Sequence, residues 1–183
     1  NALTDLEHPC QALADFLTIK EEFHDFKNSV ITFVGDGNNV ANSLILCGAL
    51  LQVEVRIACP FGYEPRKEII NKARSIYKND NLLKISNDPF SAVSGANVLY
   101  TDVWSSMGEE KQKAKKDGDF KGYTLDTSLL NRADKDAIVL HCLPAYRGKE
   151  ITDEVFESEK SRIFEQAENR LHVQQALLSC LLS

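Results

Sequence analysis

Short, largely apolar runs recur along the chain, separated by longer stretches in which apolar residues return with a helical period. They occupy residues 30–34, 53–58, 82–85, 96–101 and 137–140. Apolar runs of this length between turn residues are typical of strands buried on both faces. Strands that alternate with helices at this spacing predict right-handed crossovers. We therefore expect an α/β fold, Rossmann-like, with three αβα layers around a mainly parallel five-stranded sheet.

The first helix is predicted from about residue 8 to residue 23. Pro9 suits its first position, where a missing N–H has no partner to lose. One face is expected to dock on a core, and the polar residues are expected to lie largely away from it. The docking residues are Leu13, Phe16, Leu17 and Phe23, and the polar ones are Asp15, Lys20, Glu21 and Glu22. His8 and Gln11 lie at the first turn, where free N–H groups favour an anion. The alternative is that His8 caps the helix and Gln11 is solvated.

The last apolar run, at 137–140, leads into His141-Cys142-Leu143-Pro144. Pro144 ends the strand, because it cannot donate to a ladder. Ligands of open α/β sheets bind outside the carboxyl ends of the strands, so His141 and Cys142 are candidates for chemistry. The alternative is that Cys142 only packs, since cysteine is among the residues most often buried.

The first strand leads into Gly35-Asp36-Gly37-Asn38-Asn39 and then a helix to about residue 51. Gly35, Gly37 and Val40 form a G-x-G-x-x-V pattern that lacks the third glycine of a dinucleotide fingerprint. The second strand ends in Ala58-Cys59-Pro60, without the acidic residue that would hold a ribose. A nicotinamide site is therefore weakly supported. Asn38 and Asn39 either present amides to a ligand or only cap the helix.

The fourth strand ends at Asp102, which precedes Ser106-Met107-Gly108-Glu109. Ser106 and Glu109 satisfy a capping box, which explains the segment without any ligand. That account leaves Asp102 unexplained. A carboxylate with hydroxyl groups at a strand end, beside a glycine, is suited to grip an ammonium group and close over it.

The terminal helix is predicted over about residues 166–182. Arg170 lies near its start, and none of its neighbours three or four residues away on the helix is acidic. Its partner must therefore come from elsewhere in the fold or be a ligand such as a phosphate or a carbonyl oxygen. A lysine-rich stretch is expected to be a solvated helix and loop without chemistry. Its lysines are Lys111, Lys113, Lys115 and Lys116.

Length and charge narrow the classes of function. The 183 residues suit one domain with a proper core. The net charge of −6 and the lack of a basic stripe argue against nucleic acid and anionic membranes as partners. No apolar run approaches a membrane span and the start does not resemble a signal peptide, so a cytoplasmic protein is expected. The five widely spaced cysteines predict free thiols and no zinc site.

Taken together, these motifs resemble one family. They are His8-Pro9-Cys10-Gln11, Gly35-Asp36-Gly37-Asn38-Asn39, Asp102 with Ser106-Met107-Gly108, His141-Cys142-Leu143-Pro144, and Glu168-Asn169-Arg170. Their order and spacing resemble those of the ornithine carbamoyltransferases over almost the whole chain. His-Cys-Leu-Pro with Ser-Met-Gly is specific to the ornithine enzymes, whereas His-Pro-x-Gln is shared across the aspartate/ornithine transcarbamoylase superfamily.

The resemblance implies the domain organisation. Residues 1–183 resemble the carboxyl-terminal, ornithine-binding domain, with a linker helix over about 8–23 and a returning terminal helix over about 166–182. The family's amino-terminal carbamoyl-phosphate domain carries a Ser-x-Arg-Thr loop, and no such string occurs here. That domain is therefore expected to be absent and the isolated piece inactive. Homotrimers, in which a neighbour lends the phosphate loop, are usual in the family.

The resemblance also implies a reaction and roles for individual residues. Carbamoyl phosphate would carbamoylate the δ-amine of L-ornithine, giving citrulline and phosphate in arginine metabolism, with no metal or organic cofactor. The implied ornithine-binding residues are Asn39, Asp102, Ser106 and Met107, and the implied carbamoyl-phosphate-binding residues are His8, Gln11, Cys142, Leu143 and Arg170. Cys142 and Asp102 form the implied catalytic pair. Cys142 would accept a proton or orient the amine, and its thiol, with a usual pKa of about 8.5, could act as acceptor if neighbouring cations lowered that pKa.

Three alternatives stay open at this point. A dehydrogenase would bind a nicotinamide cofactor at residues 35–40. A non-catalytic domain would bind an amino acid without converting it. A transcarbamoylase for putrescine or acetylornithine is the nearest competitor, and Ser106-Met107-Gly108 argues against both of those substrates.

Overall fold

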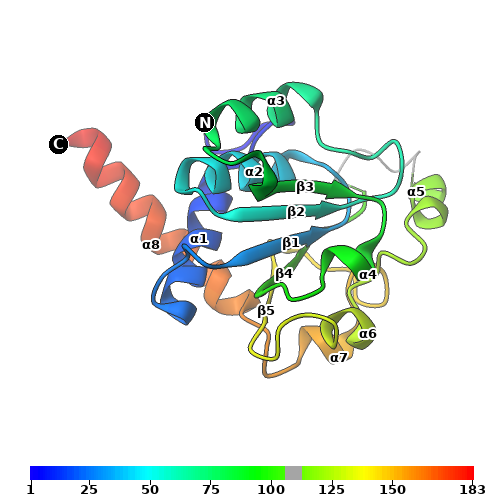
Figure 1. The fold of residues 1–183 in the computed structure, drawn as a ribbon. Coiled ribbons are helices and arrows are strands. Elements are labelled where there is room, and N and C mark those ends of the chain that lie inside the picture. Colours follow the sequence, from blue (N-terminus) through cyan, green and yellow to red (C-terminus); the bar gives the residue numbers. More distant parts are fainter. Residues whose placement is uncertain (106–112) are drawn as a thin grey trace.

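The computed structural model describes residues 1–105 and 113–183 and confirms the predicted α/β fold (Figure 1). The elements in chain order are α1 (Pro9–Phe23), β1 (Val30–Val34), α2 (Asn39–Leu51), β2 (Glu54–Ala58), α3 (Lys67–Ile76), a 3-10 turn η1 (Asp80–Leu82), β3 (Leu83–Ser86), α4 (Pro89–Ala92), β4 (Val98–Thr101), α5 (Lys113–Asp119), α6 (Thr127–Leu130), β5 (Ile138–His141), α7 (Asp153–Phe156) and α8 (Ile163–Leu182). All five predicted strands are present. Within this part of the chain, no helix is both long enough and apolar enough to cross a bilayer.

The five strands are all parallel, in the order β3-β2-β1-β4-β5. The chain runs outward from β1 to β3 and then returns to the other side of β1 to form β4. The direction of winding therefore reverses between β1 and β4, where open sheets of this kind place their ligands. The register sets Val34 beside Thr101 and Thr101 beside His141, so these three strands end in one row.

Helices cover both faces of the sheet, as successive strand residues point to opposite sides. On β1, Ile31 and Phe33 pack with α1, α2 and α3. On the other face, Leu99 of β4 and Val139 of β5 pack with the segments around α4, α6 and α7. The strands are thus buried on both sides, which is why they are nearly continuous apolar runs in the sequence.

Three details differ from the sequence predictions. Helix α8 begins at Ile163, so Arg170 lies two turns inside it and not near its start. From Pro65 the sequence predicts a helix to about Asn79, and the observed α3 is shorter at both ends. Lys116 is not solvated: it is 4% exposed, and its Nζ lies 2.7 Å from the Asp36 carboxylate in the β1–α2 loop.

Helix α1 is buried on more sides than its apolar pattern predicted, because it packs against both α2 and α8 (Figure 1). Leu13, expected to dock, is 40% exposed, whereas Asp15, expected to lie away from the core, has no exposed surface. The carboxyl-terminal half of α8 extends beyond the body of the molecule. The prediction of free thiols is confirmed for all five cysteines.

Candidate active site

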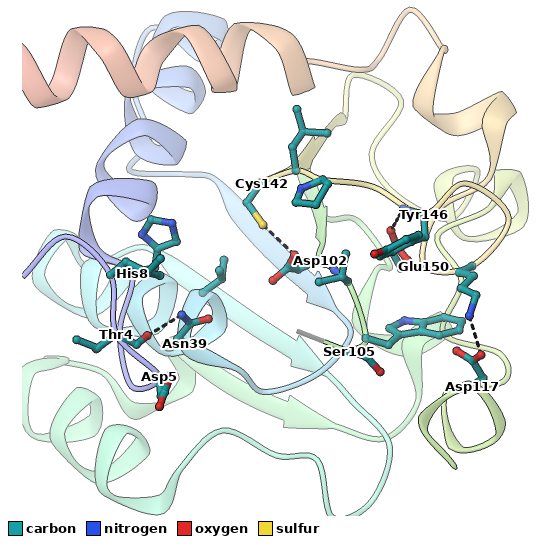
Figure 2. Close-up of a pocket in the computed structure, with 17 residues that line it drawn as sticks. Thr4, Asp5, His8, Asn39, Asp102, Ser105, Asp117, Cys142, Tyr146 and Glu150 are labelled. Atoms are coloured by element: carbon teal, nitrogen blue, oxygen red, sulfur yellow. Dashed lines mark hydrogen bonds and ion pairs between the residues drawn. The ribbon is translucent and has the colours of Figure 1, made fainter. Parts of the chain in front are cut away.

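A cavity of about 560 Å³ opens at the carboxyl ends of β1, β4 and β5 (Figure 2). Its walls also include the amino-terminal segment and the segment that follows β5. Five of the predicted site residues line this cavity: His8, Asn39, Asp102, Cys142 and Leu143. Gln11 and Arg170 do not line it: Arg170 contacts His8, and Gln11 contacts Arg170. Ser106 and Met107 lie outside the described residues.

The Asp102 carboxylate is the negative charge at the centre of this edge, and it is 6% exposed. Because Thr101 pairs with His141, the next residues on the two strands, Asp102 and Cys142, also lie close together. Cys142 Sγ donates to Asp102 Oδ1 at 2.9 Å, and the Val103 backbone N–H donates to the same oxygen at 2.7 Å. These bonds hold the carboxylate in one orientation.

The third donor to Asp102 is Asn38, the neighbour of the predicted ornithine-binding residue Asn39. Asn38 Nδ2 lies 2.7 Å from Asp102 Oδ2, while its own side-chain oxygen caps α2. Asn39 lines the cavity and donates to the Thr4 backbone oxygen at 2.8 Å (Figure 2). Sequence reasoning could not choose between the adjacent asparagines, because the choice depends on which of them becomes the cap.

Gly37 is explained by the chain itself and not by a ligand. A Cβ atom at this position would lie 2.3–2.6 Å from backbone atoms of residues 63–65, in the β2–α3 loop. The second glycine of the G-x-G pattern is therefore required for this close approach of two loops. Gly37 therefore no longer supports the nicotinamide alternative, which depended on Gly35 and Gly37.

The Cys142 thiol is protonated in this environment. Its removal from water raises the pKa of Cys142 well above the usual value, and the charge of Asp102 raises it further. The neighbouring group is a carboxylate and not a cation, so the condition under which the thiol could accept a proton is not met in this structure. A neutral thiol that donates to Asp102 can orient a substrate amine, whereas it is a poor proton acceptor.

His141 holds the chain that follows β5 and does not reach the cavity, being 1% exposed. Its Nδ1 accepts from the Leu143 backbone N–H at 2.9 Å, so in the neutral ring the hydrogen is on Nε2. Nε2 lies 3.3 Å from Glu150 Oε1, which also accepts from the Tyr146 backbone N–H. The N–H of Leu143 is thus already used, and only its carbonyl group is free to contact a carbamoyl group.

A histidine, a glutamine and an arginine meet where α1 begins beside α8. Arg170 Nη1 donates to Gln11 Oε1 at 2.7 Å and lies 3.2 Å from His8 Nε2. His8 Nδ1 lies 3.0 Å from the Ala2 backbone oxygen, which can only accept. His8 is therefore neutral, with its hydrogen on Nδ1. Consistently, burial and then the charge of Arg170 lower the pKa of His8.

Arg170 has no acidic partner on its own helix, and its partners are His8 and Gln11 at the start of α1. Within the described ranges the hydrogen bonds of the guanidinium all use Nη1, so Nε and Nη2 remain as donors for a substrate. Gln11 is 1% exposed, and both of its amide atoms bind protein groups. In this structure Gln11 therefore supports Arg170 and does not itself face the cavity.

Three atoms that could ligate a metal lie within 4.8 Å of one another, on Asp102, His141 and Cys142. Each already takes part in a hydrogen bond: His141 Nδ1 accepts from Leu143, and the thiol donates to Asp102. That the reaction needs no metal and no organic cofactor stays a prediction.

The chain was compared with protein families and with solved structures. The family model described as "Aspartate/ornithine carbamoyltransferase, Asp/Orn binding domain" matches residues 27–181. The chain belongs to this family. An ornithine carbamoyltransferase of Prochlorococcus marinus (strain MED4) is 79% identical over the whole chain, and one from Nostoc sp. (strain PCC 7120) is 54% identical. The chain spans 59% and 60% of the lengths of these two relatives.

Solved structures of the carbamoyltransferase family agree with this assignment. The ornithine carbamoyltransferase from Pyrococcus furiosus superposes with a TM-score of 0.93 at 43% identity, covering 98% of this chain and 57% of that one. The enzyme from Gloeobacter violaceus gives a TM-score of 0.89 at 46% identity, covering 100% of this chain and 61% of that one. The resemblance that the motifs indicated is thus confirmed.

Proposed function

We propose that the chain is the ornithine-binding part of an ornithine carbamoyltransferase, which transfers the carbamoyl group of carbamoyl phosphate to the δ-amine of L-ornithine. The observation that carries the proposal is a cavity, in a member of this family, whose wall holds the oriented Asp102 carboxylate and His8, with Arg170 in contact with His8. In the reaction a C–N bond forms, the C–O bond to phosphate breaks, and the amine loses one proton. Citrulline and phosphate are the products.

The charges of the site suit the two substrates. Asp102, together with Asn39, Ser106 and Met107, is proposed to bind ornithine, with the carboxylate facing its α-ammonium group. The free N–H groups of Arg170 are proposed to donate to the carbamoyl oxygen, where negative charge develops during attack. His8 and Gln11 hold the guanidinium in place for this role.

Cys142 and Leu143 are proposed to complete the carbamoyl pocket from the end of β5. The raised pKa of Cys142 favours the orienting role for its thiol over the role of proton acceptor. The carbonyl group of Leu143 is available to accept from the carbamoyl NH₂ group, because only its N–H is used by His141.

The proposal includes partners that bind the phosphate of carbamoyl phosphate. The described cavity wall carries Asp5, Asp102, Asp117 and Glu150 and one lysine, Lys149, which is paired with Asp117, so its charge is mainly negative and disfavours a phosphate dianion. We infer that an amino-terminal carbamoyl-phosphate domain supplies the phosphate site and that the enzyme acts as a homotrimer in the cytoplasm. The greater length of the curated relatives supports the additional domain.

The test is a chimera in which residues 1–183 replace the matching part of the 79% identical Prochlorococcus enzyme. With carbamoyl phosphate, the chimera should form citrulline from ornithine and react far more slowly with putrescine or acetylornithine. The intact Prochlorococcus enzyme is the positive control. A folded chimera that binds ornithine but forms no citrulline would overturn the proposal and favour a non-catalytic amino-acid-binding domain.

A further inference from the structure

A buried carboxyl group lies beneath the candidate site, between α1 and α8. Asp15 has no exposed surface, and three side chains converge on its Oδ1 atom. The Gln166 amide nitrogen lies 2.6 Å from this oxygen, the Gln11 amide nitrogen 2.9 Å and the Tyr100 hydroxyl 3.3 Å. One oxygen atom thus joins side chains of α1, β4 and α8.

These bonds fix which way both glutamine amides are turned. Because Asp15 Oδ1 accepts, each glutamine must direct its NH₂ group inward, and its carbonyl oxygen then faces the opposite way. Gln11 Oε1 accepts from Arg170, and Gln166 Oε1 accepts from the backbone N–H of His141 at 2.9 Å. If either amide rotated by half a turn, it would present an N–H group to another donor.

Both glutamines connect Asp15 to the candidate site. Through Gln11, the carboxyl group sets the position of the guanidinium of Arg170, which also contacts His8. Through Gln166, it holds the last residue of β5, immediately before Cys142. No other side chain in the part of the chain that the structure describes bonds to both amides.

We propose that Asp15 is a positioning residue for carbamoyl transfer, which orients Gln11 and Gln166 and, through them, Arg170 and the end of β5. The proposal rests on the proposed function for its effect on the rate, whereas the orientation of the two amides can be tested without any reaction.

A purely structural role does not explain why a carboxyl group occupies this place. Its Oδ2 atom is buried without a partner among the described residues, and such groups are costly in a protein interior. Thr18 and Asn169 join the same two helices by a neutral hydrogen bond of 3.0 Å that touches neither glutamine. Asn169 also donates to Glu21 at 2.7 Å, and Arg162 at the start of α8 pairs with Glu22, so the α1–α8 interface has contacts that do not involve Asp15.

The variants separate orientation from packing. Asp15→Asn keeps an oxygen at Oδ1 and places its NH₂ group where Oδ2 has no partner, so it should preserve both amide orientations. Asp15→Leu removes the acceptor at similar volume. Thr18→Val is the matched control, because it removes a buried hydrogen bond at the same interface and leaves Gln11 and Gln166 untouched.

The first measurement uses residues 1–183 and NMR of nitrogen-15-labelled protein. In Asp15→Leu, the side-chain NH₂ signals of Gln11 and Gln166 and the backbone amide signal of His141 should move and exchange faster with solvent. These signals should stay in place in Asp15→Asn and in Thr18→Val. Unmoved signals in a folded Asp15→Leu variant would overturn the proposal.

The second measurement uses the chimera with the Prochlorococcus enzyme. In Asp15→Leu, the KM for carbamoyl phosphate should rise about tenfold or more. The KM for ornithine should change little, because Asn38 and Val103 hold Asp102 independently. Asp15→Asn should restore the wild-type KM. Equal changes in both KM values, or a loss of activity that follows the melting temperature in Thr18→Val as well, would show a merely structural role.

A second variant covers the case in which Asp15→Leu does not fold. Gln166→Met has similar volume and removes only one of the two amides, so it should move the His141 amide signal and lower kcat while leaving the Gln11 signals in place. An unmoved His141 signal would contradict the proposal. If the wild-type chimera makes no citrulline, the proposed function fails, and the NMR result still decides the role of Asp15.

Discussion

At the scale of single residues, the candidate site depends on a carboxylate held by three donors. Asp102 accepts from the Cys142 thiol, the Val103 backbone and the Asn38 amide. These bonds hold the carboxylate in one orientation at the cavity wall. A charge held in this way discriminates between amines by the groups at the end remote from the reacting amine. Ornithine has an α-ammonium and an α-carboxylate at that end, whereas putrescine has an ammonium group without the carboxylate that would help to fix it.

Asp102→Asn removes the charge and keeps the shape. In the chimera, we expect kcat/KM for ornithine to fall about 30-fold, or about 2 kcal/mol, because the α-ammonium loses its partner. The already low activity with putrescine should change much less. Both constants are measured by steady-state kinetics in wild type and variant. Equal losses for the two amines would assign Asp102 to the chemical step together with Cys142.

The buried Asp15 carboxyl group should make the stability of the fold depend on pH. Burial raises the pKa of Asp15 from 3.8 to about 7, so the folded state binds this proton more tightly than the unfolded state. The free energy of unfolding should therefore fall as the pH rises from about 4 to about 7, by up to about 1.4 kcal/mol per pH unit. Arg170 opposes this shift in part. Tyr100, Cys47 and Cys142 also face Asp15 and stay protonated over this range.

Asp15→Asn has no proton to lose and should remove this dependence. Urea unfolding of residues 1–183 at about pH 5 and about pH 7 gives the free energy of unfolding for each protein. Relative to Asp15→Asn, the wild type should be less stable at the higher pH. A difference between the two proteins that does not vary with pH would contradict the raised pKa.

Most of the residues that sequence reasoning found lie at strand or helix ends, and Arg170, two turns inside α8, is the exception. Asp102 and Cys142 were identifiable because polar residues that follow buried strands face the ligand edge of a sheet. Asp15 was missed because it lies in the middle of a helix whose two neighbours are far away in sequence. Lys116 was missed because its carboxylate partner, Asp36, comes from a loop 80 residues earlier. Such pairings are set by tertiary contacts and leave no local pattern.

At the scale of elements, the strands were easier to predict than the helices. A strand buried on both faces must be apolar throughout, and all five such runs became strands. Helix boundaries were less certain, since the ends of α3 and the start of α8 depend on caps and packing that periodicity does not report. The buried face of α1 was also partly wrong, because a helix packed between α2 and α8 no longer divides into an apolar face and a polar face.

The terminal helix α8 carries an exposed apolar surface. Its exposed large side chains are Phe164, Leu171, Leu178, Leu181 and Leu182. Apolar patches on a projecting helix favour association with other surfaces. Residues 1–183 should therefore self-associate as the concentration rises, which light scattering measures directly. Replacing Leu178 and Leu181 together by lysine should yield a monomer, and a wild-type protein that stays monomeric at high concentration would contradict the prediction.

At the scale of the whole molecule, the proposed function makes residues 1–183 one wall of an active site. The mainly acidic lining of the cavity suits an amine and offers little to a phosphate dianion. Positioning of two reactants accounts for about 7–11 kcal/mol of a barrier, so the loss of the second substrate's site is a large defect.

Residues 1–183 alone should therefore form no citrulline from ornithine and carbamoyl phosphate. A colorimetric citrulline assay tests this prediction, with the chimera as positive control and calorimetry with ornithine to show that the amine site is intact. Turnover by residues 1–183 alone would mean that the phosphate is bound within this chain after all.

The contact between His8 and Arg170 also bears on the order in which the parts of the chain fold. The two residues are separated by 162 positions, and they meet only when α8 has packed beside α1. During synthesis the strands β1 to β5 are complete before Arg170 has been added, so the sheet can form while the site still lacks its guanidinium. Contacts between such distant positions form late because closing a long loop costs entropy that only the finished fold repays. We therefore expect Arg170 to join His8 late in folding, after the sheet whose strands all precede it in the chain.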